Sequence, residues 1–120
     1  MRNATELSVG SVNVSRETFE ELRAYESLVR RWTPAINLVS KASVDDLWQR
    51  HIADSAQVLA ATGAESAQSW VDLGSGGGFP GLVVAVLAKE LRPDLRVTLV
   101  ESDLRKATFL RQAAQALSLS

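Results

Sequence analysis

The residues best suited to chemistry lie in one glycine-rich run, Trp70–Gly81, which follows a short apolar stretch and precedes a helical pattern. Five of the seven glycines in the chain fall within eight residues there. Glycine tolerates positive φ and lets a ligand approach the backbone with no Cβ in the way. A strand, a glycine turn and the open N-terminus of a helix together predict a binding site for an anionic group.

A carboxylate follows this run at an informative distance. Arg96–Glu101 predicts a second strand, which ends in Glu101 some twenty residues past the turn. In nucleotide-binding α/β folds, an acid at this place accepts hydrogen bonds from ribose hydroxyls. The glycine turn and Glu101 together predict a pocket for a nucleoside-bearing cofactor.

Two cofactor classes fit the glycine run. Gly76–Gly81 satisfies G-x-G-x-x-G, the dinucleotide fingerprint, which is a weak indication by itself. Asp72–Gly78 satisfies D-x-G-x-G-x-G, the first motif of S-adenosylmethionine-dependent methyltransferases. The methionine end of that cofactor offers a carboxylate, which suits backbone N–H groups, and an ammonium, which suits Asp72. We favour a methyltransferase, and a nicotinamide-dinucleotide-binding oxidoreductase fragment is the alternative.

The motif and its surroundings resemble one family closely. The string Val71–Gly81, with its Phe79-Pro80-Gly81 ending, is similar to the signature of the bacterial 16S ribosomal RNA guanine-N7 methyltransferases, also called the glucose-inhibited division protein B family. The resemblance covers roughly residues 19–120. The other segments that share it are Trp32, Ile36–Ser40, Trp48–Ser55, Val97–Ser102, Arg105-Lys106 and Phe109-Leu110.

The resemblance implies S-adenosyl-L-methionine as the cofactor and 16S ribosomal RNA in the small ribosomal subunit as the partner. The residues expected to bind the cofactor are Asp72, Gly74, Ser75, Gly76, Gly78, Phe79 and Glu101. Guanine N7 already has a free lone pair, so its methylation requires positioning and no general base. The residues that hold the guanine are expected beyond residue 120, so the catalytic residues are unknown.

Composition excludes several other classes of protein. The net charge is −1 and neither half is basic, so the RNA partner rests on the family resemblance and not on charge. With no cysteine and one histidine, we expect no metal site. The chain has neither a secretory signal nor eighteen consecutive apolar residues, so we expect no membrane span and a cytoplasmic protein.

The pattern along the chain divides it into three parts. Residues 1–14 are expected to be a flexible arm, and residues 15–60 an N-terminal helical segment. In that segment Ser15 caps a helix that ends at Thr33, before a proline, and Ser43 caps a second helix that continues to about Ala60. Residues 70–120 are expected to be the first half of the methyltransferase domain.

That last part has the pattern of one βαβ unit with a trailing helix. The predicted elements are a strand at Trp70–Leu73, a helix at Pro80–Leu91, a strand at Arg96–Glu101 and a helix at Asp103–Leu117. The expected fold class is α/β, a Rossmann-like methyltransferase fold with parallel strands, of which only the first half of the sheet is present. We expect such a chain to be inactive by itself, with possible self-association through uncovered apolar surface.

His51, Asp54 and Ser55 lie at helical spacing and can share one face. A hydrolase triad on one helical turn has poor geometry, because no separate oxyanion site remains. Two interpretations stay open. His51 is a buried histidine that hydrogen-bonds to Asp54, or its face borders the mouth of the cofactor site.

Overall fold

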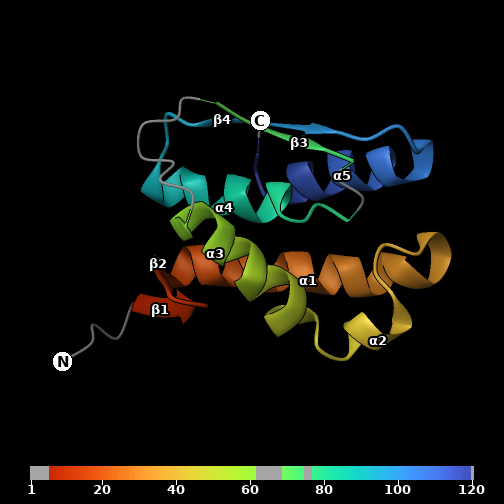
Figure 1. The fold of residues 1–120 in the computed structure, drawn as a ribbon, viewed down its shortest axis with the longest axis horizontal. Coiled ribbons are helices and arrows are strands. Elements are labelled where there is room, and N and C mark those ends of the chain that lie inside the picture. The colour runs from red at the N-terminus through yellow and green to blue at the C-terminus, as the bar shows by residue number, and fades with distance from the viewer. Residues whose placement is uncertain (1–5, 62–68, 75–76, 120) are drawn as a thin grey trace.

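The computed structural model describes residues 6–61, 69–74 and 77–119, and it has a mixed α/β fold (Figure 1). A short antiparallel hairpin comes first, then four helical elements, and then alternating strands and helices. In chain order the elements are β1 (Glu6–Val9), β2 (Val12–Ser15), α1 (Arg16–Ile36), α2 (Lys41–Val44), the π-helix η1 (Trp48–Ala53), α3 (Asp54–Ala61), β3 (Ser69–Leu73), α4 (Gly81–Leu91), β4 (Arg96–Val100) and α5 (Leu104–Ala116).

The strands β3 and β4 are parallel neighbours, joined by α4. Their register pairs Ser69 with Arg96 at one end and Leu73 with Val100 at the other. Because the strands run in the same direction, the loops after both leave the same edge of the sheet. The predicted βαβ unit is therefore present, and its strand and helix limits lie within one residue of those expected from the sequence.

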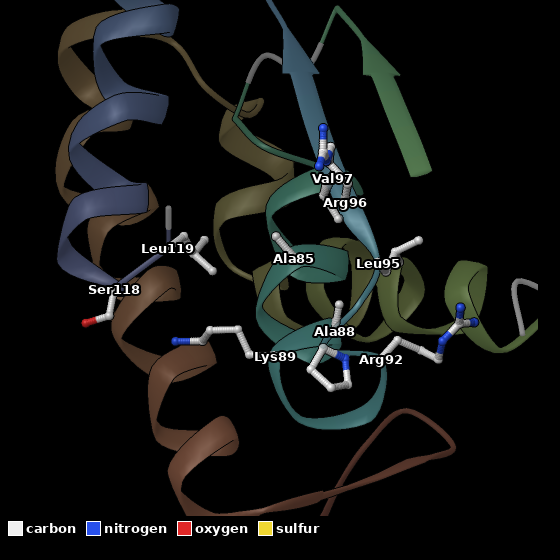
Figure 2. Close-up of a pocket in the computed structure, with 10 residues that line it drawn as sticks. Ala85, Ala88, Lys89, Arg92, Leu95, Arg96, Val97, Ser118 and Leu119 are labelled. Atoms are coloured by element: carbon white, nitrogen blue, oxygen red, sulfur yellow. The ribbon is translucent and has the colours of Figure 1, made fainter. Parts of the chain in front are cut away.

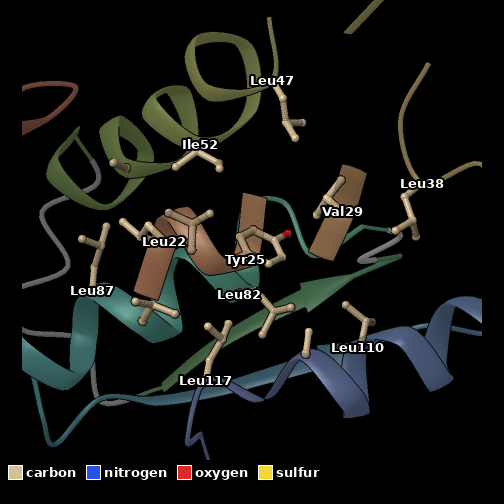
Figure 3. Packing of buried hydrophobic residues seen from close by; sticks show 14 of the residues in the cluster. Leu22, Tyr25, Val29, Leu38, Leu47, Ile52, Leu82, Leu87, Leu110 and Leu117 are labelled. Carbon is tan, nitrogen blue, oxygen red and sulfur yellow. The ribbon is translucent and has the colours of Figure 1, made fainter. Parts of the chain in front are cut away.

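The elements lie in layers (Figure 1). Helix α4 packs against β3 and β4, and α1 packs against α4 and α5 on the side away from the sheet. Tyr25 of α1 lies at the centre of the core, with Leu22 and Val29 from its own helix and Leu82 from α4 around it (Figure 3). Complete burial of such aliphatic side chains contributes about 1.5–3 kcal/mol each.

One face of the β3–β4 sheet packs against the core, and the other is exposed to solvent. Trp70 and Val97 pack against Val84 and Leu95 on the helix side. The other face carries apolar side chains toward solvent, with exposed fractions of 58% for Val71, 75% for Leu73 and 46% for Val100. Within the part of the chain that the structure describes, nothing covers this outer face of the sheet.

Residues 6–15 form a β-hairpin, so the prediction of a flexible arm over 1–14 is wrong for the described part of that segment. Val9 pairs with Val12 across the turn, where Gly10 has a φ of +61°. Glycine at positive φ is what tight hairpin turns require. Val9 and Val14 are fully buried in the main core, which fixes the hairpin on the helices.

Helix α1 begins as expected but ends later. The Ser15 hydroxyl accepts the backbone N–H of Thr18, which confirms the predicted cap. The predicted stop at Thr33 is wrong, because the helix continues through Pro34 to Ile36, and Asn37 closes it in the left-handed conformation. Ile36 is buried and extends the apolar stripe of the helix, so packing outweighs the hydrogen bond that proline cannot donate.

The second predicted helix is divided into shorter pieces. Its cap is Ser40, whose hydroxyl accepts the N–H of Ser43, and not Ser43 as expected. Helix α2 ends at Val44, and the chain then enters η1 and α3. The wider π-helical turn lets Leu47 and Ile52, five residues apart, both be fully buried.

Candidate cofactor site

The residues expected to bind the cofactor gather where β3 and β4 end. The backbone N–H of Gly74 donates to the carbonyl of Val100 at 2.7 Å, so the parallel pairing continues one residue past β3. Glu101 follows Val100 directly. The structure thus brings the glycine turn and the second acid to one edge of the sheet.

Asp72 lies on β3 with a half-buried side chain directed toward α4. Its Oδ2 accepts the backbone N–H of Gly81, the first residue of α4, at 3.0 Å. A carboxylate near a helix N-terminus is also favoured by the helix dipole. An ionised carboxylate accepts hydrogen bonds and carries the negative charge that a cationic ligand group requires.

The two described glycines among the predicted residues differ in what surrounds them. Gly74 has a φ of +68°, and an added Cβ would meet nothing within 4 Å. Gly78 has a φ of +95°, but its Cβ would lie 2.7 Å from both the Tyr25 hydroxyl and a Leu82 methyl. A Cβ on Gly74 would thus enter open space, whereas the protein itself requires glycine at position 78. Ser75 and Gly76 lie outside the described residues.

Phe79 directs its ring into the protein. The ring centroid lies 5.3 Å from that of Tyr25 on α1 and 4.8 Å from that of His51 on η1. The sequence singled out Phe79 as a cofactor-binding residue. The structure shows that its half-buried side chain is part of the packing behind the turn.

Glu101 is held by the start of α5. Its Oε2 accepts the backbone N–H of Asp103 at 3.0 Å. Asp103 in turn caps α5, since its Oδ1 accepts the N–H groups of Arg105 and Lys106. Hydrogen bonds from the Lys106 and Arg105 backbone, aided by the charges of these two side chains, lower the pKa of Asp103. The carboxylate of Glu101 is therefore fixed at the sheet edge.

Two further residues lie directly behind the site. The sequence did not indicate Tyr25, whereas for His51 one of the two open interpretations placed its face at the mouth of the cofactor site. The buried hydroxyl of Tyr25 donates a hydrogen bond to the carbonyl of Gly77. Burial, and secondly the charge of Asp72, raise the pKa of Tyr25 well above its ordinary value, so the hydroxyl stays protonated as a donor. The sequence signal for Tyr25 was its place on the buried stripe of α1, between Leu22 and Val29.

His51 is the second of these residues. Its Nε2 is buried and has no hydrogen-bond partner among the described residues. Burial, followed by the nearby Arg50 charge, lowers the pKa of His51, and the opposing charge of Asp54 does not reverse this. The ring contact with Phe79 favours the interpretation that the face of His51 borders the turn.

A separate pocket of about 210 Å³ lies elsewhere (Figure 2). It is bordered by Arg96, the first residue of β4, and is therefore at the opposite end of the sheet from the glycine turn. Its Lys89 ammonium already binds the Glu21 carboxylate at 2.7 Å and the Leu117 carbonyl at 2.8 Å. This pocket does not include any predicted site residue.

The described residues were also compared with the requirements of a metal site and of a membrane-spanning helix. Among them, no group of three or more His, Cys, Asp or Glu side chains is placed to hold a metal ion. None of the helices within the described ranges combines the length and apolar character needed to cross a bilayer. What they do present is two acids and an open glycine at one sheet edge, which fits a ligand with cationic and hydroxyl groups.

Comparison with known proteins bears directly on this fit. A family model described as GidB, rRNA small subunit methyltransferase G, matches residues 18–120. The chain belongs to this family. The match begins at the third residue of α1 and includes both strands of the parallel pair, so it covers every described element of the candidate site.

Curated members of the family are similar to the chain over most of its length. The ribosomal RNA small subunit methyltransferase G of Ruegeria sp. (strain TM1040) is 54% identical over 109 residues, which are 91% of this chain and 52% of that protein. The proteins of the same name from Parvibaculum lavamentivorans and Rhodospirillum centenum are each 55% identical, over 86% and 85% of this chain and 45% and 44% of their own lengths. The chain thus spans about half the length of the curated relatives it matches. These matches give no support to the dinucleotide-dependent oxidoreductase alternative.

Proposed function

We propose that this chain supplies the cofactor-binding part of a methyltransferase that uses S-adenosyl-L-methionine to methylate guanine N7 in 16S ribosomal RNA. The observation that carries the proposal is the common sheet edge, where the parallel register of β3 and β4 brings the open Gly74 and the acids Asp72 and Glu101 together. The names of the relatives, which specify small-subunit ribosomal RNA, support this class of substrate.

Each acid has a distinct task in this proposal. Asp72 accepts the ammonium of the methionine end, because a carboxylate at that place offers a charge-assisted hydrogen bond. Gly74, with Ser75 and Gly76, lets the cofactor approach the backbone of the turn, whereas Gly78 is needed for packing against Tyr25 and Leu82. Glu101 accepts hydrogen bonds from the ribose hydroxyls, and its bond from the Asp103 N–H holds it in place for this.

The methyl transfer requires the protein mainly to position the two reactants. When bound, the cofactor supplies a methyl group on a positively charged sulfur. Guanine N7 has a free lone pair, so no side chain has to remove a proton from it. The residues of this chain orient the cofactor and keep water from its reactive end, which is the positioning contribution to catalysis. N7 lies in the deep groove of duplex RNA, so the target guanine belongs in a loop or in a splayed-out position.

We also propose that β3 and β4 belong to a larger Rossmann-like sheet. The uncovered apolar face formed by Val71, Leu73 and Val100 supports this, because such sheets have helices on both faces. The relatives are about twice as long as the region they share with this chain, which leaves room for further strands. The guanine-holding residues belong to that additional part.

Calorimetric titration of this chain with S-adenosylhomocysteine tests the cofactor assignment. We expect one saturable site, and no binding of NADH in a parallel titration. Binding of NADH without any response to S-adenosylhomocysteine would instead support the oxidoreductase alternative.

A chimera tests the substrate. Residues 1–120 replace the matched segment of the Ruegeria relative, and the product is incubated with unmethylated small ribosomal subunits and labelled S-adenosylmethionine. We expect label at guanine N7 of the digested 16S ribosomal RNA, and none when the chimera carries Glu101→Ala. Label at another base would contradict the proposal, and so would label at guanine N7 that is as strong with Glu101→Ala as without it. The 120-residue chain without the added half is expected to transfer no methyl group.

A further inference from the structure

The ring of Phe79 contacts aromatic side chains from two helical elements of the N-terminal segment. Tyr25 of α1 is tilted by 50° at a centroid distance of 5.3 Å. His51 of η1 is tilted by 31° at 4.8 Å, which is closer and more nearly stacked. Aromatic pairs at such separations contribute about 0.5–1.5 kcal/mol beyond the area they bury.

The α1 side of this arrangement also fixes the backbone of the turn. The Tyr25 hydroxyl donates to the Gly77 carbonyl, and the same hydroxyl occupies the space that a Cβ on Gly78 would need. Three consecutive residues, Gly77, Gly78 and Phe79, therefore contact one side chain of α1. The Phe79 ring has a second aromatic contact, which a group outside α1 provides.

His51 provides that group. It belongs to η1, which is anchored by the fully buried Leu47 and Ile52 on either side of it. Its Nε2 is buried without a hydrogen-bond partner among the described residues. Leaving a polar atom so placed costs free energy. Within the described part of the chain, a hydrogen bond through Nε2 thus does not hold the ring in place, and its aromatic contact is the one with Phe79.

The position of Phe79 is transmitted to the candidate site over a short distance. Only Pro80, whose φ is fixed by its ring, separates Phe79 from Gly81. The N–H of Gly81 donates to Asp72, and the N–H of Leu82 donates to the carbonyl of Gly78 at 2.7 Å. A displacement of the Phe79 ring would thus alter the bond that orients Asp72.

We propose that His51 is a positioning residue of the cofactor turn, and that its ring holds Phe79 against Tyr25 so that Gly77–Gly81 keeps the conformation that binds the cofactor. The identity of the cofactor rests on the proposed function. The clamping of the turn does not, because it is a property of the unliganded chain.

The test compares three variants of this chain. His51→Ala removes the ring, and His51→Phe restores a ring without the nitrogens. Trp48→Ala is the matched control, because Trp48 lies on the same π-helix but contacts Phe19 at 5.3 Å and Arg23 instead of the turn. For each variant we measure hydrogen exchange of the Gly81 and Leu82 amides, affinity for S-adenosylhomocysteine and the melting temperature.

For His51→Ala we expect faster exchange at both amides and affinity weakened about threefold to tenfold, which is the loss of one aromatic pair converted to a binding ratio. His51→Phe should restore both quantities. Trp48→Ala should lower the melting temperature without changing either.

Three results would overturn the proposal. They are unchanged exchange in His51→Ala, exchange that rises equally in Trp48→Ala, and failure of His51→Phe to restore it. A wild-type chain that binds no S-adenosylhomocysteine would instead contradict the proposed function, and the exchange data would still decide the role of His51.

Discussion

The carboxylate of Asp72, at the end of β3, accepts the backbone N–H of Gly81 at the start of α4 over 3.0 Å. This bond joins the strand to the helix across the glycine turn and sets how closely they approach. A Cβ on Gly81 would lie 2.6 Å from Asp72 Oδ2 and closer still to a methyl of Leu99 on β4. Glycine is required at position 81 because α4 meets both strands there.

We expect Gly81→Ala to destabilise the chain by about 1–3 kcal/mol, the usual cost of overpacking. The added methyl displaces Asp72, so affinity for S-adenosylhomocysteine should fall as well. Denaturant unfolding and calorimetry measure the two effects. Leu99→Val removes the colliding methyl, so the double variant should be more stable than the sum of the single changes predicts. Strict additivity would show that the close contact with Leu99 is not the cause.

Glu101→Gln should weaken the binding of S-adenosylhomocysteine by roughly tenfold, because a neutral amide replaces a charged acceptor at the ribose hydroxyls. The amide oxygen still accepts the Asp103 N–H, so the free energy of unfolding should change little. Titration calorimetry gives the affinity. A 2′,3′-dideoxyribose analogue that binds as tightly as the parent compound would contradict this role for Glu101.

The parallel unit could be predicted from the sequence because its signals are local. Apolar runs, the glycine turn and Pro93 mark the limits of β3, α4 and β4 to within one residue. The meeting of Asp72, Gly74 and Glu101 at one edge then follows from the parallel register. The hairpin also has a local signal, the valines that flank Gly10, but these residues have no helical periodicity and were expected to be part of a flexible arm.

The remaining features depend on contacts between distant parts of the chain. Pro34 continues a helix because Ile36 packs into a core formed by other elements. Tyr25 and His51 are separated from Gly77 and Phe79 by 52 and 28 positions, and no spacing rule connects them. Their roles become evident only when α1 and η1 lie against the turn.

Glu90, at the end of α4, stabilises the chain in a pH-dependent way. Its carboxylate oxygens accept the backbone N–H of Ser15 at 3.0 and 3.1 Å. Burial by itself would raise the pKa of Glu90, but the hydrogen bonds from the Ser15 backbone and from the Thr18 and Ser15 hydroxyls lower it below its ordinary value of 4.5. Between the lowered pKa of Glu90 in the folded chain and its ordinary value of 4.5, the folded chain therefore binds fewer protons than the unfolded chain. The stabilisation by Glu90 is thus complete above pH 4.5 and is lost as the pH falls through the pKa that Glu90 has in the folded chain.

Glu90→Gln should therefore reduce the free energy of unfolding at pH 7 by about 0.5–1 kcal/mol, a charged hydrogen bond reduced by solvent screening. The difference from the wild type should shrink as the pH falls below 4.5. Urea unfolding across pH 3–7 measures it. Glu20→Gln, on the exposed side of α1, is the control and should show no such trend. A constant difference at every pH would exclude titration of Glu90 as the cause.

The outer face of the β3–β4 sheet should mediate self-association of this chain. Val71 and Leu73 are 58% and 75% exposed and lie on one face of β3, and a contiguous apolar patch of this kind favours contact with a second copy. We expect Val71→Thr combined with Leu73→Thr to weaken self-association about tenfold in sedimentation velocity, while the free energy of unfolding of the monomer changes by less than about 0.5 kcal/mol. Threonine keeps the branched shape that strands favour, so the strand itself should persist.

Leu91→Gln, at the far end of α4 where the side chain is 41% exposed, serves as the control and should leave association unchanged. A wild-type chain that stays monomeric at high concentration, or a double variant that associates as strongly as the wild type, would show that this face is not the contact.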